Sequence, residues 1–261
     1  MTKIKVVSFL IVSVLIMAMF VSGCAKKSEP SEETAAPAQK APTAIDQATV
    51  GTITGKISYS GAKPTPKVIH MDTEPACVSS NSGPVYTQDL EVNSNNTLKD
   101  VFVSVSGGVD NYTFTVPTTP ATLDQRGCTY HPHVLGVMAG QALQVLNSDN
   151  TTHNIHPIPK ENPEWNTSMP PKAQPLDKKF NRPETMIPVK CNVHPWMKAY
   201  IGVVKNPFFS VTGDDGSFEI KGLPPGDYTV SAWQEKLGTQ TMKVTVGPKE
   251  SKTVDFSFKG E

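Results

Sequence analysis

Short runs of alternating apolar and polar residues, separated by turn residues, are the feature that most limits how this chain can fold. Alternation with a period of two is typical of half-buried β-strands, and no long stretch has the 3.6-residue period of an amphipathic helix. The pattern predicts strands over residues 53–58, 67–71, 89–92, 101–105, 112–116, 134–137, 142–146, 186–189, 200–204, 217–220, 228–233, 241–246 and 253–258. The sequence therefore predicts an all-β protein built from β-sandwiches. Its length of 261 residues allows two domains.

The first 23 residues are typical of an export signal. Lys3 and Lys5 precede an apolar stretch over residues 6–21, which is shorter than the ~20 residues that a membrane-spanning helix needs. Residues 21–24, Val-Ser-Gly-Cys, resemble the lipobox of bacterial lipoproteins. The resemblance implies cleavage before Cys24 and a membrane anchor through lipid on Cys24. Because Ala25 is not Asp, we expect the outer membrane, facing the periplasm or the cell surface.

Composition predicts a tether and excludes one class of partner. Residues 24–48 are rich in Lys, Glu, Ser, Pro and Ala and contain little that a core could bury, which predicts a disordered tether. The whole chain carries 24 basic and 24 acidic residues. Without a basic field to attract phosphates, nucleic acid is not an expected partner.

One short loop gathers three side chains that bind soft metals. Cys191, His194 and Met197 follow the spacing Cys-x2-His-x2-Met. A thiolate, an imidazole and a thioether are three of the four groups in a trigonal copper site that has two His, one Cys and a weak axial Met. The fourth group is expected to be His153, 38 residues before Cys191. His156 is the competing imidazole, but on a regular strand it faces the side opposite to His153.

The segment 124–205 resembles the cupredoxins, the blue copper proteins that include plastocyanin and amicyanin. The resemblance rests on Tyr130-x-Pro132, on the pair His153-Asn154 and on the loop 191–197. It implies a Greek-key sandwich that holds one type 1 copper ion, with Asn154 joining the two ligand loops. His194, Pro195 and Trp196 are then expected at a solvent-facing rim that serves as the electron port.

The segment 206–261 resembles the carboxypeptidase regulatory-like domain, a transthyretin-type β-sandwich. The resemblance rests on the run over 211–220 and on Gly222-Leu223-Pro224-Pro225-Gly226. Such a domain starts with a Gly-x-Ile-x-Gly pattern, which occurs here at Gly51 to Gly55. We therefore expect residues 49–75 and 206–261 to share one sandwich, with the cupredoxin-like segment inserted. The alternative is that the N-terminal β region, 49–123, forms a separate domain.

The four cysteines divide between these roles. With Cys24 assigned to lipid and Cys191 to metal, Cys77 and Cys128 remain, and an exported location permits a disulfide between them. Closing that loop would contribute about 4 kcal/mol in the chain-entropy model. Two buried free thiols are one alternative. A second metal site for zinc or Cu(I), built from Cys128, His131 and His133, is another.

These predictions combine into a functional hypothesis. The chain is expected to be a lipid-anchored type 1 copper protein that carries single electrons between redox proteins of the cell envelope. No catalytic motif stands out, and four protein ligands leave no open metal position, so an enzyme is not expected. One alternative is copper storage or delivery. Another is a carbohydrate- or surface-binding module in which the cupredoxin-like domain is structural.

Overall fold

A computed structural model describes residues 43–260, which form 17 strands and one short helix, α1 (Pro75–Ser79). The predicted all-β fold class is confirmed. Within this described range, no helix has the length and apolar character needed to cross a membrane. The predicted signal, the lipid site at Cys24 and residues 24–42 of the predicted tether lie outside it.

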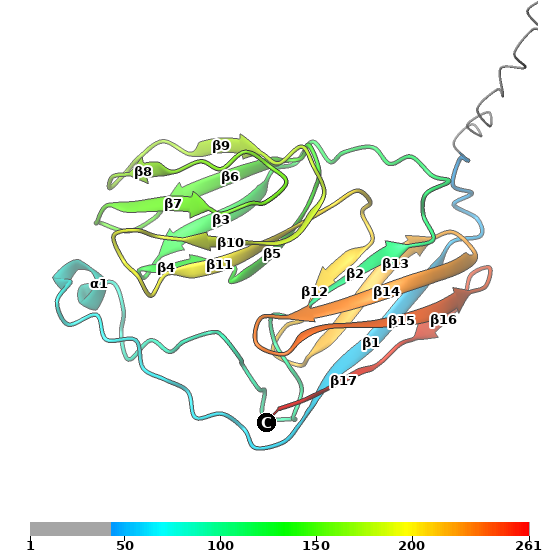
Figure 1. Cartoon of the computed structure of the whole chain (residues 1–261), viewed down its shortest axis with the longest axis horizontal. Helices are drawn as coiled ribbons and strands as arrows, with labels where there is room; N and C mark the ends of the chain where they lie inside the picture. Colours follow the sequence, from blue (N-terminus) through cyan, green and yellow to red (C-terminus); the bar gives the residue numbers. More distant parts are fainter. Residues whose placement is uncertain (1–42, 261) are drawn as a thin grey trace, which may run out of the picture. The chain divides into compact units, whose positions relative to one another are not determined.

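One β-sandwich, called here the split sandwich, takes strands from before and after a long inserted segment (Figure 1). In one sheet, β1 pairs antiparallel with β13 and parallel with β16 and β17. The other sheet has the order β12-β2-β14-β15. The bounds are β1 Gly51–Ser60, β2 Phe102–Gly107, β12 Phe209–Val211, β13 Ser217–Leu223, β14 Gly226–Gln234, β15 Gly238–Val246, β16 Ser251–Thr253 and β17 Phe256–Lys259. Strands that precede and follow the inserted segment thus share both sheets.

Alternating side chains build the core of the split sandwich. In β1, every second residue is buried, so Ile53 and Ile57 point into the core. Phe218 and Ile220 of β13 and Val230 of β14 join them. Because these cross-strand neighbours lie on one face of each sheet, the two sheets close on a continuous apolar layer.

The last residues of the predicted tether are folded, so that prediction is wrong over 43–48. Ile45 packs against the core of the split sandwich. The amide of Thr43 donates to the carbonyl of Asn111 at 2.9 Å, and Asp46 starts a turn that Thr49 closes. Apolar packing of Ile45 and backbone hydrogen bonds together attach this piece to the sandwich.

The inserted sandwich lies between β2 and β12 in the sequence. One sheet has the order β5-β11-β10-β7-β8 and the other β4-β3-β6-β9 (Figure 1). The bounds are β3 Ala121–Arg126, β4 Thr129–His131, β5 Val134–Met138, β6 Ala142–Asn147, β7 His153–Pro157, β8 Thr167–Met169, β9 Leu176–Lys179, β10 Glu184–Lys190 and β11 Lys198–Val204. Leu123, Val145, Ile155 and Ile201 are among the side chains that fill its core.

Three predicted strands are absent from the described chain. Residues 67–71, 89–92 and 112–116 form only isolated bridges, through Val68, Val92 and Tyr112. All three lie in connections on either side of β2, where no neighbouring strand offers a continuous ladder. The predicted strand 253–258 is divided between β16 and β17. Alternation alone therefore marked segments that lack a pairing partner.

The connection from β1 to β2 carries a cap, residues 69–85. The amide of Ile69 donates to the carbonyl of Val85 at 2.8 Å, which closes the base of the cap, and α1 lies within it. Met71 and Cys77 of the cap are buried in the core of the inserted sandwich. The connection between two strands of one sandwich therefore covers part of the other.

Two aromatic rings of the split sandwich pack against glycines of the inserted sandwich. Phe102 of β2 and Phe209 of β12 pack with their ring centroids 5.8 Å apart. A Cβ at Gly136 of β5 would lie 2.5 Å from Phe209, and a Cβ at Gly202 of β11 would lie 2.8 Å from Phe102. Glycine at these two neighbouring strand positions lets the aromatic rings approach the sheet of the inserted sandwich.

Candidate metal centre

Two segments at one end of the inserted sandwich, the start of β7 and the loop between β10 and β11, carry the predicted donors. His153 is the first residue of β7, Cys191 follows β10 directly, and Met197 immediately precedes β11. Nitrogen atoms of His153 and His194 and the sulfur of Cys191 lie within 4.8 Å of one another. All four predicted donors are buried, and Met197 and Cys191 belong to the same apolar core.

Backbone hydrogen bonds keep the ligand loop compact. The amide of Cys191 donates to the carbonyl of Met197 at 3.3 Å, and the amide of Met197 donates to the carbonyl of His194 at 2.9 Å. Both bonds lie within the seven-residue loop, which starts and ends on the paired strands β10 and β11. The sheet therefore fixes both ends of the loop and limits how far its donors can move.

The sulfur of Cys191 accepts hydrogen bonds from the backbone. The amides of Asn154 and His194 approach it at 3.5 and 3.4 Å. Burial raises the pKa of the Cys191 thiol, but hydrogen bonds from His153, Asn154, His194 and Val193 outweigh burial and lower the pKa below its ordinary value. The site is thus built to hold a thiolate, which is the metal-binding form of cysteine.

Asn154 joins the two ligand loops, which is the role that the resemblance implied. Its Oδ1 accepts the amide hydrogen of Asn192 at 2.6 Å and lies 3.4 Å from the sulfur of Cys191. Its Nδ2 donates to Oδ1 of Asn166 at 2.7 Å. The side chain therefore links β7 to the loop that carries the thiol and to the segment before β8.

Asp149 orients the first imidazole. Its Oδ2 lies 2.9 Å from Nε2 of His153, while Nδ1 of His153 faces Nδ1 of His194 at 2.9 Å. The backbone amides of Gly127 and Cys128 also donate to the Asp149 carboxylate, at 2.7 and 2.8 Å. Burial raises the pKa of Asp149, but these hydrogen bonds outweigh it, and the pKa is lowered.

Sequence reasoning assigned no role to Asp149, although it lies four residues before His153. An acidic residue in the loop that leads to a metal-binding His is the signal that was available. Burial lowers the pKa of His153, but hydrogen bonds and charge from Asp149 and Cys191 outweigh burial and raise the pKa. Asp149 also holds the turn at Gly127 and Cys128 beside the imidazole, so it ties the metal centre to the disulfide.

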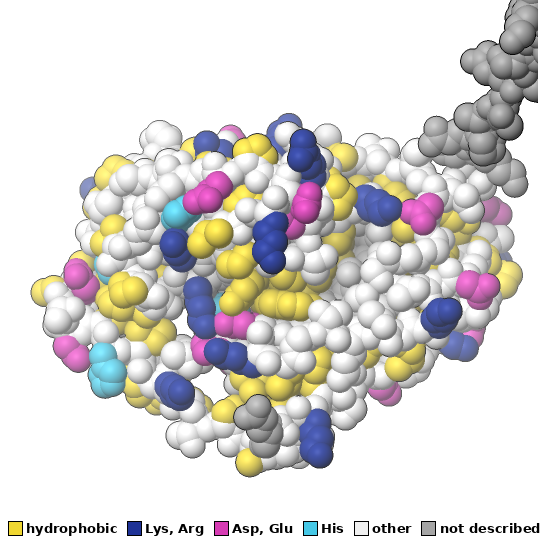
Figure 2. All heavy atoms as spheres, viewed as in Figure 1, with side chains coloured by type: hydrophobic (Ala, Val, Ile, Leu, Met, Phe, Trp, Pro, Cys, Tyr) yellow, Lys and Arg dark blue, Asp and Glu magenta, His cyan; other side chains and the backbone are white. Residues whose placement is uncertain are grey.

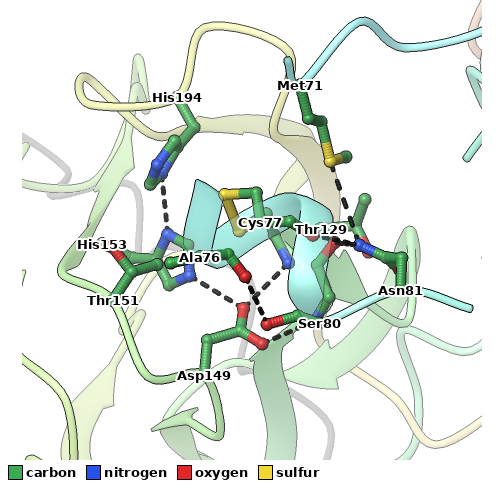
Figure 3. The surroundings of a disulfide bond; sticks show 12 residues. Met71, Ala76, Cys77, Ser80, Asn81, Thr129, Asp149, Thr151, His153 and His194 are labelled. Atoms are coloured by element: carbon green, nitrogen blue, oxygen red, sulfur yellow. Dashed lines mark hydrogen bonds and ion pairs between the residues drawn. A yellow bond between two sulfur atoms is a disulfide. The ribbon is translucent and has the colours of Figure 1, made fainter. Parts of the chain in front are cut away.

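His194 is buried, so the predicted exposure of this residue is wrong. Its exposed fraction is 0%, and its Nε2 has no hydrogen-bond partner among the described residues. Cys77 and Cys128 form a disulfide, and Figure 3 shows it beside the His194 ring. The cap covers the imidazole because α1 brings Cys77 to Cys128. The burial lowers the pKa of His194.

The rest of the predicted electron port is only partly at the surface. Pro195 is exposed and Trp196 is half-buried. The Trp196 ring lies 5.2 Å from the His194 ring, centroid to centroid, and its Nε1 donates to the carbonyl of Cys128 at 3.1 Å. Trp196 therefore also packs against the segment that carries the disulfide.

The competing histidines lie outside the donor group. His156 contacts the carboxylate of Glu164 and Oδ1 of Asn192. The ring of His131 lies 2.8 Å from the hydroxyl of Thr129. Because Cys128 is in the disulfide, the alternative metal site built from Cys128, His131 and His133 is not formed.

His133 has a different role, at the contact between the sandwiches. Its Nε2 lies 2.9 Å from Oε2 of Glu235, which follows β14, and Lys198 of β11 contacts Oε1 of the same carboxylate at 2.6 Å. Burial raises the pKa of Glu235, but the two partners outweigh it and lower the pKa. Glu235 thus links the split sandwich to the strand that leaves the ligand loop.

The charges on the visible face are mixed. Figure 2 shows basic and acidic side chains interspersed on this face, with apolar side chains gathered between them. No extended field of one sign is visible there. A surface of this kind gives little long-range attraction for a polyanion.

Comparison with protein families supports the prediction for the C-terminal segment. The sequence profile of the carboxypeptidase regulatory-like domain matches residues 201–259. The predicted resemblance is confirmed over this range, which includes β12 to β17 but neither β1 nor β2. A comparison with curated proteins found no match.

Solved structures similar to this chain are copper proteins. The Cu-containing nitrite reductase from Thermus scotoductus SA-01 aligns at 22% identity and a TM-score of 0.30, over 38% of this chain and 25% of that chain. This chain therefore spans about a quarter of the reductase. A purple cupredoxin from Nitrosopumilus maritimus aligns at 20% identity and a TM-score of 0.28, over 32% and 98% of the two chains. A mutant of amicyanin aligns at 21% identity and a TM-score of 0.29, over 32% and 81%.

Proposed function

We propose that this protein is a type 1 copper protein that carries single electrons in the cell envelope. The observation that carries the proposal is the convergence of His153, His194 and Cys191 in a buried group. A thiolate with two imidazoles is the donor set that suits copper, and Met197 from the same loop offers the weak axial thioether. Copper bound there would supply one-electron exchange between Cu(I) and Cu(II).

The protein's own contribution is to hold the donors in place. Asp149 fixes the ring of His153, Asn154 joins the two loops, and two amides point at the sulfur of Cys191. Because these hydrogen bonds restrain the donors, few atoms need to move when the charge of the centre changes. All the donors come from the chain and all are buried, so no position is left for a substrate.

The exposed face of the ligand loop is the proposed contact with a redox protein. Asn192 and Pro195 are exposed, and Val193 has an exposed fraction of 50%. Cys191 is bonded directly to Asn192, so the shortest covalent route from the centre to the surface runs through this face. The small apolar contact that it offers suits a brief encounter with a partner.

Absorption spectroscopy tests the copper assignment. Copper(II) added to the purified protein should produce an intense visible band from charge transfer between the Cys191 thiolate and the metal. Cys191→Ser should remove the band while the far-ultraviolet circular dichroism stays that of a β-protein. A copper-loaded wild-type protein without this band would contradict the proposal.

Storage or delivery of copper is a second candidate, favoured by the cap over His194. Repeated reduction and oxidation by small redox reagents separates the two functions. An electron carrier keeps one copper ion per chain through many cycles. Loss of the ion in the reduced state would favour delivery.

Anchoring through lipid on Cys24 is part of the proposal. Mass spectrometry of the N-terminal peptide should find lipid on Cys24, and Cys24→Ser should move the protein from the membrane fraction to the soluble fraction. An unmodified Cys24 in membrane-associated protein would contradict the anchor but leave the copper centre untouched.

A further inference from the structure

The disulfide between Cys77 and Cys128 lies against the metal centre. Its two sulfur atoms and one ring nitrogen of His194 lie within 4.8 Å of one another, and all three residues are buried. The sulfur of Cys128 also lies within 4.8 Å of a nitrogen of His153 and a carboxylate oxygen of Asp149. Figure 3 shows His153, Asp149, His194 and the disulfide in one group.

His194 presents an unused donor in this group. Its Nδ1 faces Nδ1 of His153 at 2.9 Å and the sulfur of Cys191 at 3.8 Å. Its Nε2 is buried and has no hydrogen-bond partner among the described residues. A buried polar atom without a partner is costly in a folded protein, so an uncompensated one calls for a functional explanation.

Apart from the disulfide, few polar contacts hold the cap, and apolar packing supplies the rest. Among residues 43–260, one hydrogen bond joins the cap to the inserted sandwich, from Nδ2 of Asn81 to the carbonyl of Gly127 at 3.0 Å. The burial of Met71 and Cys77 adds apolar contact. The outer side of α1 is exposed, and Val78 has an exposed fraction of 51%. Breaking the disulfide would therefore remove the main covalent restraint on the segment that covers His194.

We propose that Cys77, Cys128 and His194 form a second metal site, for Cu(I), when the disulfide is reduced. Two thiolates and an imidazole are soft donors that suit Cu(I). The site lies at the side of the main centre that the cap covers, so it can receive the ion and pass it to Cys191 and His153. The transfer of the ion to the main centre rests on the proposed function, whereas its binding at the second site does not.

The redox steps balance through thiol–disulfide exchange. A dithiol protein of the envelope gives two electrons and two protons to the Cys77–Cys128 bond and becomes a disulfide itself. Binding of Cu(I) by the two thiols releases their two protons. When the ion moves to Cys191, the thiolates of Cys77 and Cys128 take up two protons, one released by the Cys191 thiol and one from water. Exchange with a disulfide-carrying protein then removes two electrons and two protons, re-forms the bond and closes the cap.

The test measures Cu(I) binding in Cys191→Ser, which lacks the thiol of the main centre. A chromophoric Cu(I) chelator competes with the full-length protein without oxygen, before and after reduction by a small dithiol. Reduced protein should bind one Cu(I) about 100-fold more tightly than the disulfide form, because two thiolates become available. Equal affinities in the two forms would overturn the proposal.

Two further variants in the Cys191→Ser background identify the donors. Replacing Cys77 and Cys128 by Ser should abolish the gain in affinity, and so should His194→Ala. His70→Ala is the matched control, since it removes an exposed imidazole of the cap outside the group. Retained tight binding without the two cysteines would overturn the proposal.

X-ray absorption at the copper edge gives a readout that does not depend on how well the double variant folds. Reduced Cys191→Ser loaded with Cu(I) should show two sulfur neighbours and one nitrogen neighbour. Fewer than two sulfur neighbours would overturn the proposal. The visible band of the copper-loaded wild type tests the main centre separately. Its absence would contradict the proposed electron carrier but not the second Cu(I) site.

Discussion

Each of the two sandwiches has a buried carboxylate, and the two carboxylates differ in their hydrogen bonding and in the direction of their pKa shift. In the inserted sandwich, Asp149 is held by one imidazole and two backbone amides, and its pKa is lowered although burial raises it. In the split sandwich, just before β2, Oδ2 of Asp100 has no hydrogen-bond partner among the described residues. Burial raises the pKa of Asp100 to about 6. The carboxylate that is fully hydrogen-bonded is thus the one beside the candidate metal centre, at one end of the inserted sandwich.

The split sandwich contributes to that end from a distance. Its β1–β2 connection supplies the cap, and its Glu235 contacts Lys198, which directly follows the ligand loop. One sandwich therefore carries the donors, and the other covers and supports them.

The largest expected effect separates the two imidazoles near the centre. His153→Ala should abolish the visible copper band, because it removes one of three converging donors. His156→Ala, the matched control, should keep the band, because His156 contacts Glu164 and Asn192 instead. Absorption of the two copper-loaded variants checks this. The reverse outcome would show that the donors were assigned to the wrong histidine.

Next in size is the loss of Asp149. Asp149→Ala leaves the amides of Gly127 and Cys128 and the Nε2 of His153 without their acceptor, which should cost about 3 kcal/mol of unfolding free energy. Copper affinity should fall about 10- to 100-fold, since the ring of His153 loses its support. Denaturant unfolding and chelator competition measure both. Asp124→Ala, which removes an acceptor for the hydroxyl of Ser148, is the control and should change affinity little.

Replacing Asp100 is expected to stabilise the protein, whereas replacing Asp149 destabilises it. Because the pKa of Asp100 is raised in the folded state, the charged carboxylate destabilises the protein above about pH 6, and the penalty fades as the pH falls toward the ordinary value of 3.8. Asp100→Asn should therefore stabilise the protein at pH 7 by about 1–3 kcal/mol. Thermal unfolding across the pH range should show the gain shrinking in acid. Asp72→Asn, at an exposed carboxylate, should show no such gain. A destabilised Asp100→Asn at pH 7 would contradict the assignment.

The smallest effect concerns the contact between the sandwiches. Gly202→Ala places a Cβ 2.8 Å from Phe102 and 3.1 Å from the sulfur of Met186, so the side chains must shift at a cost of about 1 kcal/mol. Gly213→Ala is the control, because a Cβ there meets nothing within 4 Å. The denaturant midpoint of Gly202→Ala should therefore be lower than that of Gly213→Ala. Equal midpoints would show that the side chains at this contact shift without a measurable loss of stability.

Much of the fold could be predicted because the strands alternate regularly. The spacing of Cys191, His194 and Met197 located the ligand loop, since local sequence fixes a tight loop between paired strands. The turn and motif residues at Gly51 and Gly213 likewise pointed to one sandwich, and β1 pairs with β13.

The cap could not be predicted because nothing local encodes it. Residues 67–71 alternate as a strand does, yet Ile69 and Met71 pack against a sandwich that is separated from them by β2 in the sequence. The burial of His194 follows from that long-range contact. Asp149 was missed for a related reason, because its partners at 127 and 128 come from another turn.

Anomalous diffraction at the copper edge, from crystals of the copper-loaded protein, locates the bound ion directly. One strong peak is expected within bonding distance of Nδ1 of His153, Nδ1 of His194 and the sulfur of Cys191. A peak only at exposed imidazoles such as His70, with the Cys191 site empty in fully loaded protein, would contradict the proposed copper centre.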